Sequence, residues 1–374
     1  MVNTRNIIRQ FTPNWFTTIM GTGVVAIVLG HFSELHTLGA ALWLINTCLF
    51  CVFCILYMLR WSLFPHEARQ IFHHPSMSLF LGAIPMALAT LINGLLMYGN
   101  TVFGQHLPQL ALWLWYIDVV LVISIGWVVP YFMFSRQQHH LHSITAMWLL
   151  PIVAAEVAAA TGGLLVAEFV HSTQAISILW LSYMLWGMSV LPAFAILSLL
   201  ILRLALHKLP EKELAISSWL SIGPIGTGAL AMMLLGQHAP DVLQSIGMQS
   251  FGIFLQQAAK LISLVLLGCG VWWLGIAMFA SLHHLKHGIP FNLGWWGLTF
   301  PLGVFTLALS QLGQLLGWNA FDHIAVILSV ILVGLWSCVA VKTIQGAYRG
   351  QLFFSPCLQQ LQQQQKACAQ SETA

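Results

Sequence analysis

The sequence predicts an all-α polytopic membrane protein with ten transmembrane helices. Of its 374 residues, 59% are hydrophobic and only 6% are charged, whereas an ordinary soluble domain carries about 25% charged residues. A water-soluble fold has no interior large enough to hide so much apolar surface. The apolar residues also form separate runs of about 20 residues, the length that a helix needs to cross a bilayer.

These runs occur at ten places along the chain. The first of these apolar runs is interpreted as a membrane-spanning helix and not as a signal peptide, because no small-residue cleavage site follows it. We expect residues 1–348 to form a single transmembrane domain and residues 349–374 to be a short cytoplasmic, disordered tail, since its end is rich in Gln. The ten predicted spans are 14–31, 38–60, 77–98, 110–134, 145–167, 174–204, 217–237, 254–283, 293–316 and 323–345.

The basic residues predict the orientation of these spans. Twelve of the 13 Lys and Arg residues flank the first span or lie in loops after even-numbered spans, and Lys260 is the exception. Basic residues are retained in cytoplasmic loops. We therefore expect both termini to be cytoplasmic.

The odd-numbered spans share an internal repeat, because each contains a glycine or proline motif near its middle. Broken helices are tolerated in a membrane where they face protein or a water-filled cavity. We therefore expect these five parallel helices to form an inner ring with the breaks lining its centre, although packing kinks are the alternative. The residues concerned are Gly21, Gly23, Pro85, Pro151, Pro224, Gly226 and Pro301.

Three longer motifs resemble the tellurite-resistance and C4-dicarboxylate transporter family, which includes plant slow anion channels, yeast malate permease and fungal sulfite efflux pumps. The motifs lie at residues 11–23, 74–85 and 295–303, and the resemblance covers about residues 10–348. It implies five helical hairpins around a central pore, a homotrimer whose subunits each conduct, and a ninth-helix phenylalanine that plugs the pore. The second motif looks more like the malate and sulfite branch.

The resemblance implies transport of a small anion across the cell membrane, which is the inner membrane if the source is bacterial. The anion could be a C4-dicarboxylate such as malate, or an oxyanion such as sulfite or tellurite. A chloride or nitrate channel of the same fold is the alternative. Passive conduction and proton-coupled transport both remain open.

Uncharged polar residues are the candidates for contacts with an anion in the pore. Hydroxyl groups and helix-end amides can replace part of the lost hydration shell. A membrane threonine that donates to the carbonyl one turn back is the ordinary alternative. The four candidates are Thr22, Ser78, Thr227 and Thr299.

Two acidic residues, Asp118 and Glu156, lie within apolar spans. Charged groups at this depth are costly, and such residues are functional candidates. A fixed negative charge on a pore helix would repel an anion, so we expect Glu156 to be neutral, paired or turned away. A buried ion pair with Lys260 and a role in proton coupling are the two alternatives.

Other functional classes are disfavoured by what the spans contain. A membrane enzyme or haem protein would need a nucleophile with its base, or facing histidines inside the membrane. The 16 histidines instead gather at span ends, where we expect interfacial groups that add positive charge at low pH. We therefore predict no catalytic residues, no metal, no cofactor and no nucleic-acid partner, only a small anion and the lipid bilayer.

Phe300 is the predicted pore gate. It precedes Pro301, so its backbone lies at the predicted break of the ninth span, and a hydrophobic constriction stops ions by excluding water. The resemblance independently implies a gate on this helix. Phe305 is the second choice, and a packed or lipid-facing Phe300 is the alternative.

Overall fold

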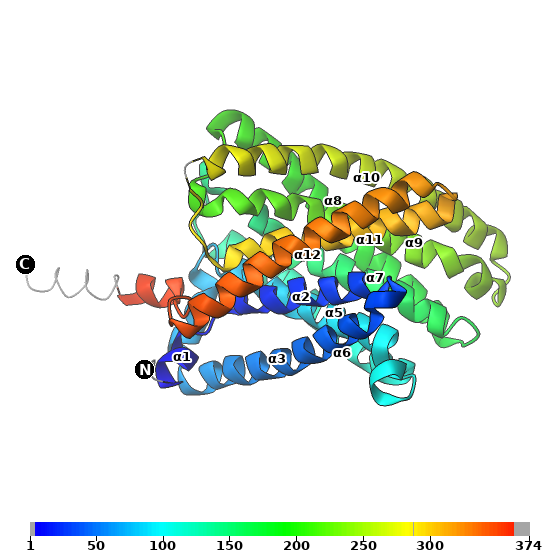
Figure 1. The fold of residues 1–374 in the computed structure, drawn as a ribbon, viewed down its shortest axis with the longest axis horizontal. Coiled ribbons are helices and arrows are strands. Elements are labelled where there is room, and N and C mark those ends of the chain that lie inside the picture. Colours follow the sequence, from blue (N-terminus) through cyan, green and yellow to red (C-terminus); the bar gives the residue numbers. More distant parts are fainter. Residues whose placement is uncertain (1–3, 287, 363–374) are drawn as a thin grey trace, which may run out of the picture.

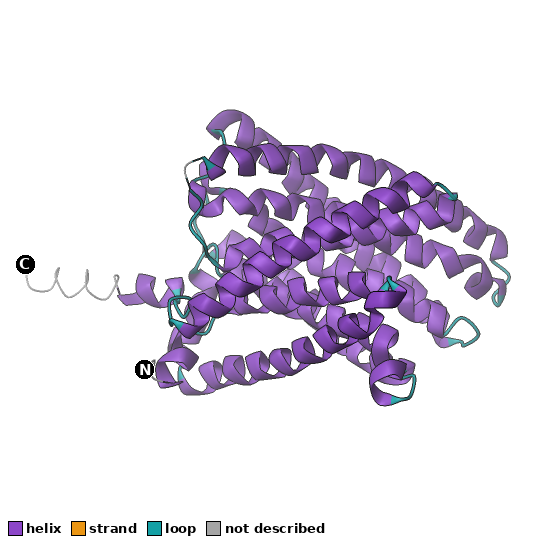
Figure 2. Cartoon of the chain, in the orientation of Figure 1, coloured by secondary structure: helices purple, strands orange, loops and turns teal. Residues whose placement is uncertain are grey.

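A computed structural model describes residues 4–286 and 288–362 of the chain (Figure 1). Within these residues the fold is built from helices and connecting loops, without strands (Figure 2). Ten helical spans are long and apolar enough to cross a membrane, as the sequence predicted. They are Pro13–Gly30, Ser33–Leu63, Ser78–Phe103, Pro108–Ser135, Ala146–Glu168, Gln174–His207, Lys212–Gln244, Gln249–Leu285, Leu293–Leu316 and Asn319–Tyr348.

The odd-numbered spans form an inner ring of five α-helices. Each contacts the next in chain order, and the fifth contacts the first, which closes the ring. In the most apolar stretch of each inner span, 78% to 89% of the residues are buried within the protein, against 17% to 33% in the outer spans. The inner helices are α2 (Phe16–Gly30), α5 (Ala83–Phe103), α7 (Leu150–Glu168), α9 (Ile222–Gln244) and α11 (Thr299–Leu316).

The even-numbered spans pack outside this ring, each against the inner helix that precedes it. Their outward faces carry large apolar side chains such as Trp127, Phe134 and Phe279, which suits contact with lipid. Because one outer span separates successive inner spans, all five inner helices start at the same end of the bundle. The outer helices are α3 (His36–Leu63), α6 (Pro108–Ser135), α8 (Gln174–His207), α10 (Gln249–Leu285) and α12 (Asn319–Tyr348).

The four prolines that were predicted to break the inner spans lie at the start of α-helices and not at breaks within them. Pro151 is the second residue of α7, and Pro85, Pro224 and Pro301 are each the third residue of their helix. Proline fits there because first-turn N–H groups have no acceptor inside the helix. A 3₁₀ segment comes directly before each inner helix: η1 (Pro13–Trp15), η4 (Ser78–Gly82), η6 (Ala146–Leu149), η7 (Lys212–Ser221) and η8 (Leu293–Leu298).

The glycines that were expected to line the ring's centre instead allow its helices to approach closely. A side-chain Cβ at Gly23 would lie 2.2 Å from the Thr90 hydroxyl oxygen, and one at Gly226 would lie 2.9 Å from the Phe305 Cα. Helix α2 is also continuous across Gly21 and Gly23, so the predicted break there is wrong.

Both described ends of the chain lie at one end of the bundle, where α1 (Thr4–Gln10) and the last turn of α12 are found (Figure 1). The first part of the predicted tail packs here. The buried Arg60 donates to the Phe11 carbonyl and, at 3.3 Å, to the Ser355 hydroxyl. The Ser355 amide donates to the Gln10 side chain at 2.7 Å. The remainder of the tail, residues 363–374, lies outside the described residues.

Candidate functional site

Two cavities lie inside the ring of inner helices. The first, called here the inner cavity, has a volume of about 530 Å³ and is lined by the 3₁₀ segments and first turns of the inner spans and by the C-terminal segment after α12, through Gln351, Leu352, Phe354 and Pro356. The second, the outer cavity, has a volume of about 290 Å³ and is lined by later turns of the inner helices. Every inner span contributes to both. The inner cavity includes Met20, Phe80, Leu150, Leu220 and Gly297, and the outer cavity includes Val24, Thr90, Val157, Thr227 and Phe300.

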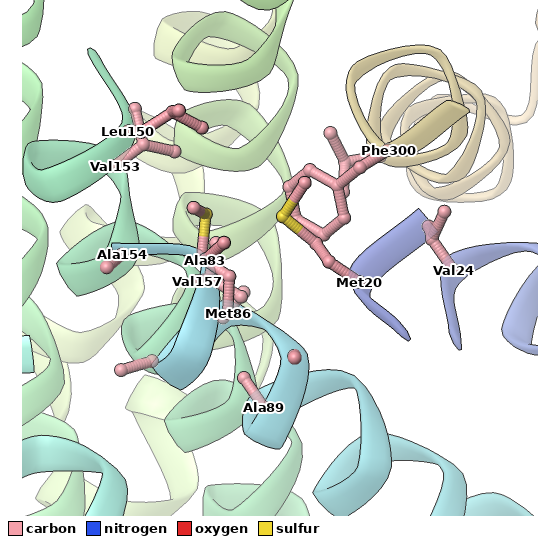
Figure 3. Close-up of a cluster of buried hydrophobic side chains, with 14 of the residues drawn as sticks. Met20, Val24, Ala83, Met86, Ala89, Leu150, Val153, Ala154, Val157 and Phe300 are labelled. Carbon is pink, nitrogen blue, oxygen red and sulfur yellow. The ribbon is translucent and has the colours of Figure 1, made fainter. Parts of the chain in front are cut away.

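An apolar barrier separates the two cavities. Met20 of α2 lines the inner cavity and is fully buried, while Phe300 of α11 lines the outer cavity and is only 3% exposed. Figure 3 shows the Phe300 ring beside the Met20 side chain, with Met86 and Val157 facing them from α5 and α7. The ring of helices is therefore closed at this level by side chains and not by backbone.

Phe305, the second choice for the gate, points away from the cavities. A Cβ at Gly270 of α10 would lie 2.4 Å from the edge of the Phe305 ring. The side chain is 1% exposed and packs between the ring and the outer helices. Of the two phenylalanines, only Phe300 contributes to the lining of a cavity.

The four predicted polar candidates are placed in different environments. Thr227 lines the outer cavity, and its buried hydroxyl has no hydrogen-bond partner in the described chain. Thr22 instead accepts a hydrogen bond from the Trp336 indole at 3.1 Å, and Ser78 accepts one from Gln137 at 3.1 Å. Thr299 donates to the Trp296 carbonyl at 2.8 Å. Only Thr227 therefore offers an unused hydroxyl group to a cavity.

Several polar residues that were not predicted as site residues also line the outer cavity. Asn93 is one of them, and its side-chain oxygen is buried without a partner among the residues that the structure describes. The Nδ1 of His31 forms a hydrogen bond of 2.9 Å with the Ile27 carbonyl, and the Gln311 side chain donates to the Gln237 side chain at 3.0 Å. Asn93 could have been predicted from the sequence, because a single carboxamide in an apolar span must either form a hydrogen bond or face a cavity.

Neither cavity is lined by Lys or Arg among the residues that the structure describes. Each lining contains one carboxylate residue, Glu213 in the inner cavity and Glu168 in the outer. Glu168 forms an ion pair of 2.7 Å with the exposed His106. Attraction for an anion must therefore come from polar groups, helix ends and, in the outer cavity, His31.

The two buried acidic residues lie outside both cavities. Glu156 accepts a hydrogen bond from the Ser189 hydroxyl at 2.7 Å, while its second oxygen is buried without a partner. Both carboxyl oxygens of Asp118 are also buried without partners in the described structure. The two ion pairs found among the described residues are Arg9 with Glu67 and His106 with Glu168, so the expected pair with Lys260 does not form.

Two of the histidines near the ends of the spans, His74 and His139, lie in environments that oppose a positive charge. Burial lowers the pKa of His74, whose Nδ1 accepts hydrogen bonds from the Ser76 and Met77 amides at 3.2 Å. Burial also lowers the pKa of His139. Among the described residues no three His, Cys, Asp or Glu side chains are grouped so that they could hold a metal ion. His287 lies outside those residues.

Comparison with known proteins adds to this geometry. The sequence matches the family described as voltage-dependent anion channel over residues 10–344. It is 34% identical to the sulfite efflux pump of Arthroderma otae over 352 residues, which cover 92% of this chain and 93% of that protein. It is 26% identical to an uncharacterized transporter of Methanocaldococcus jannaschii (93% and 98% covered) and 23% identical to the malic acid transport protein of Schizosaccharomyces pombe (88% and 76% covered).

Proposed function

The chain belongs to the voltage-dependent anion channel family, and from this premise we propose that it moves a small oxyanion or carboxylate through the ring of inner helices. The path runs from the inner cavity, past the Met20 and Phe300 side chains, to the outer cavity. The observation that supports the proposal is that Phe300, which lines the outer cavity, lies beside Met20, which lines the inner cavity.

The helix ends support an anion as the cargo. Each inner span begins with its 3₁₀ segment beside the inner cavity, and the start of a helix carries a partial positive charge of about +0.5 from N–H groups that have no acceptor inside the helix. Five such ends make the inner cavity attractive to an anion although Lys and Arg are missing from its described lining. No bond-breaking chemistry is expected along this path.

The relatives support a choice of substrate class. A sulfite efflux pump and a malic acid transport protein are both similar to this chain, so sulfite, malate and related small anions such as tellurite are the first candidates. Chloride and nitrate are the alternative. Flux into proteoliposomes, measured for each anion with and without a pH gradient, separates these substrates and separates passive conduction from proton coupling.

Replacing Phe300 by Ala tests the gate. We expect anion flux in proteoliposomes to rise about tenfold or more, because lowering a barrier by about 1.4 kcal/mol raises a rate tenfold. Phe305→Ala is the matched control, since its ring packs against α10. That variant should lower thermal stability without opening the path. Unchanged flux through a folded, membrane-inserted Phe300→Ala protein would remove Phe300 from the gate.

A homotrimer with one path in each subunit is proposed on the family resemblance. The exposed apolar faces of the outer helices offer surface for subunit contacts as well as for lipid. Native mass spectrometry of the purified protein measures the state directly, and a predominantly monomeric protein would contradict this part of the proposal.

A further inference from the structure

The hydroxyl group of Thr227 differs from those of the other buried threonines on the inner helices. In the described chain, those threonines each donate to a backbone carbonyl three or four residues earlier, as Thr90 does to Ala87 at 2.7 Å and Thr306 to Leu302 at 2.8 Å. Thr227 is 1% exposed, lines the outer cavity and makes no such bond. A buried hydroxyl without a partner costs free energy, so this group is suited to a ligand inside the cavity.

A second unpaired polar group lines the same cavity from another helix. Asn93 lies on α5, where its side-chain oxygen is buried without a hydrogen-bond partner and its amide N–H groups make no hydrogen bond with a described residue. Helices α5 and α9 are separated by α7 in the ring, so Asn93 and Thr227 belong to different sides of the lumen. The carboxamide can present its N–H group and the hydroxyl its O–H, which makes both of them neutral donors.

The charges around the outer cavity limit the ligand. Its described lining contains neither Lys nor Arg, and its acidic residue is Glu168. The cost of removing an ion from water grows with the square of its charge, and neutral donors compensate a single charge far better than a double one. An anion with several oxygens can also accept hydrogen bonds from two sides through different atoms, so it reaches donors that are farther apart than those a single halide ion can contact.

We propose that the outer cavity contains a subsite for one singly charged oxyanion, bound by the Thr227 hydroxyl and the Asn93 carboxamide on the outer side of Phe300. This subsite rests on the anion path proposed above. It would hold a partly dehydrated anion next to the apolar barrier. Substrate choice would then depend on charge and on the number of oxygen acceptors.

Nitrate binding tests the subsite, because nitrate keeps a single charge across the working pH range. Isothermal titration calorimetry on the purified full-length protein should show nitrate binding that weakens about tenfold in Thr227→Val, since one hydrogen bond to a charged group is lost. Asn93→Leu should weaken it similarly, and Thr227→Ser should restore it. Thr306→Val is the matched control, because it removes a buried hydroxyl that lines neither cavity.

Sulfate and chloride test the ligand class. Sulfate has the oxygens but two charges, and chloride has the charge but no oxygens, so both should bind at least about tenfold more weakly than nitrate. Equal affinity for nitrate and sulfate would overturn the single-charge preference, and equal affinity for chloride would overturn the oxyanion preference. Absence of nitrate binding in the folded wild type would overturn the subsite.

Flux measurements separate this inference from the proposed function. If nitrate binds at Thr227 but no anion crosses even in Phe300→Ala, the proposed path fails and the subsite stands. If anions cross and folded Thr227→Val has unchanged nitrate affinity, the subsite fails and the path stands.

Discussion

At the scale of single residues, Glu156 shows how a buried acid can lie beside an anion path without obstructing it. Its carboxyl group is fully buried, accepts one hydrogen bond from Ser189 and lines neither cavity. An unpaired negative charge at this depth would be costly. We therefore expect the carboxyl group to be uncharged, and turned towards α8 and α9 instead of the lumen.

Glu156→Gln tests this expectation because glutamine keeps the size and the acceptor oxygen. Anion flux should stay within about twofold of wild type, because the glutamine oxygen can still accept the buried hydrogen bond from the Ser189 hydroxyl. Ser189→Ala is the control that removes only the hydroxyl donor. Flux lost at every pH, together with weaker anion binding, would show that the charge itself is needed.

Thr22 and Thr227 illustrate why a residue's type does not give its role. Both follow a glycine in the second turn of an inner helix, and both are small hydroxyl side chains. Thr22 accepts a hydrogen bond from Trp336 of α12, whereas the Thr227 hydroxyl lines the outer cavity without a partner in the described chain. The difference lies in which face of the helix each residue occupies.

At the scale of secondary-structure elements, the change from 3₁₀ to α-helix recurs in every inner span. It places a proline in the first α-helical turn of four of them, where the missing N–H costs nothing. Each inner span also begins, with its 3₁₀ segment, inside the protein and beside the inner cavity. The repeated sequence motif therefore encodes helix starts around a common cavity.

The glycines of the inner helices set the distance between neighbouring helices, and Gly226 gives the sharpest test. A Cβ added there would lie 2.9 Å from the Phe305 backbone, so Gly226→Ala should force α9 and α11 apart and cost about 1 to 3 kcal/mol. Gly268→Ala is the control, because nothing lies within 4 Å of its Cβ position. That substitution should be neutral or stabilise α10 slightly.

Thermal unfolding of the two purified variants in one detergent measures this contrast. The midpoint should fall for Gly226→Ala and stay or rise for Gly268→Ala. Equal midpoints would mean that the close approach of α9 and α11 contributes little to stability.

At the scale of the whole molecule, ten spans return the chain to the side on which it starts. Figure 1 shows α1 and the last turn of α12 at the same end of the bundle. Most Lys and Arg residues flank this end of the spans. Because basic residues are retained on the cytoplasmic side, the inner cavity should open to the cytoplasm.

Reporter fusions test this orientation. Both termini lie on the same side as the basic loops. A reporter fused to either terminus should therefore be active if it is of a type that functions in the cytoplasm, and inactive if it functions only outside the cell. The control is the same reporter inserted in the loop at residues 31–35, which should respond as an external site. Activity of a C-terminal reporter only outside the cell would overturn both the orientation and the assignment of the inner cavity.

The sequence by itself determined the ten spans and their division into two classes. Hydropathy is a property of consecutive residues, so the ninth span was predicted at residues 293–316 and is found as Leu293–Leu316. The repeated proline and glycine motifs likewise singled out the inner helices, because such residues are tolerated only where protein surrounds them. Phe300 was predicted to lie near the centre of the ring because it precedes Pro301, the proline of the ninth span.

The tertiary structure alone decided what those residues touch. Gly23 meets Thr90, Gly226 meets Phe305, and Phe300 lies beside Met20, each on a different helix. It also left Asn93 and Thr227 unpaired in the outer cavity while Lys260 stayed apart from both buried acids. These relations depend on the rotation and closeness of helices far apart in the chain, which the order of residues along one helix does not contain.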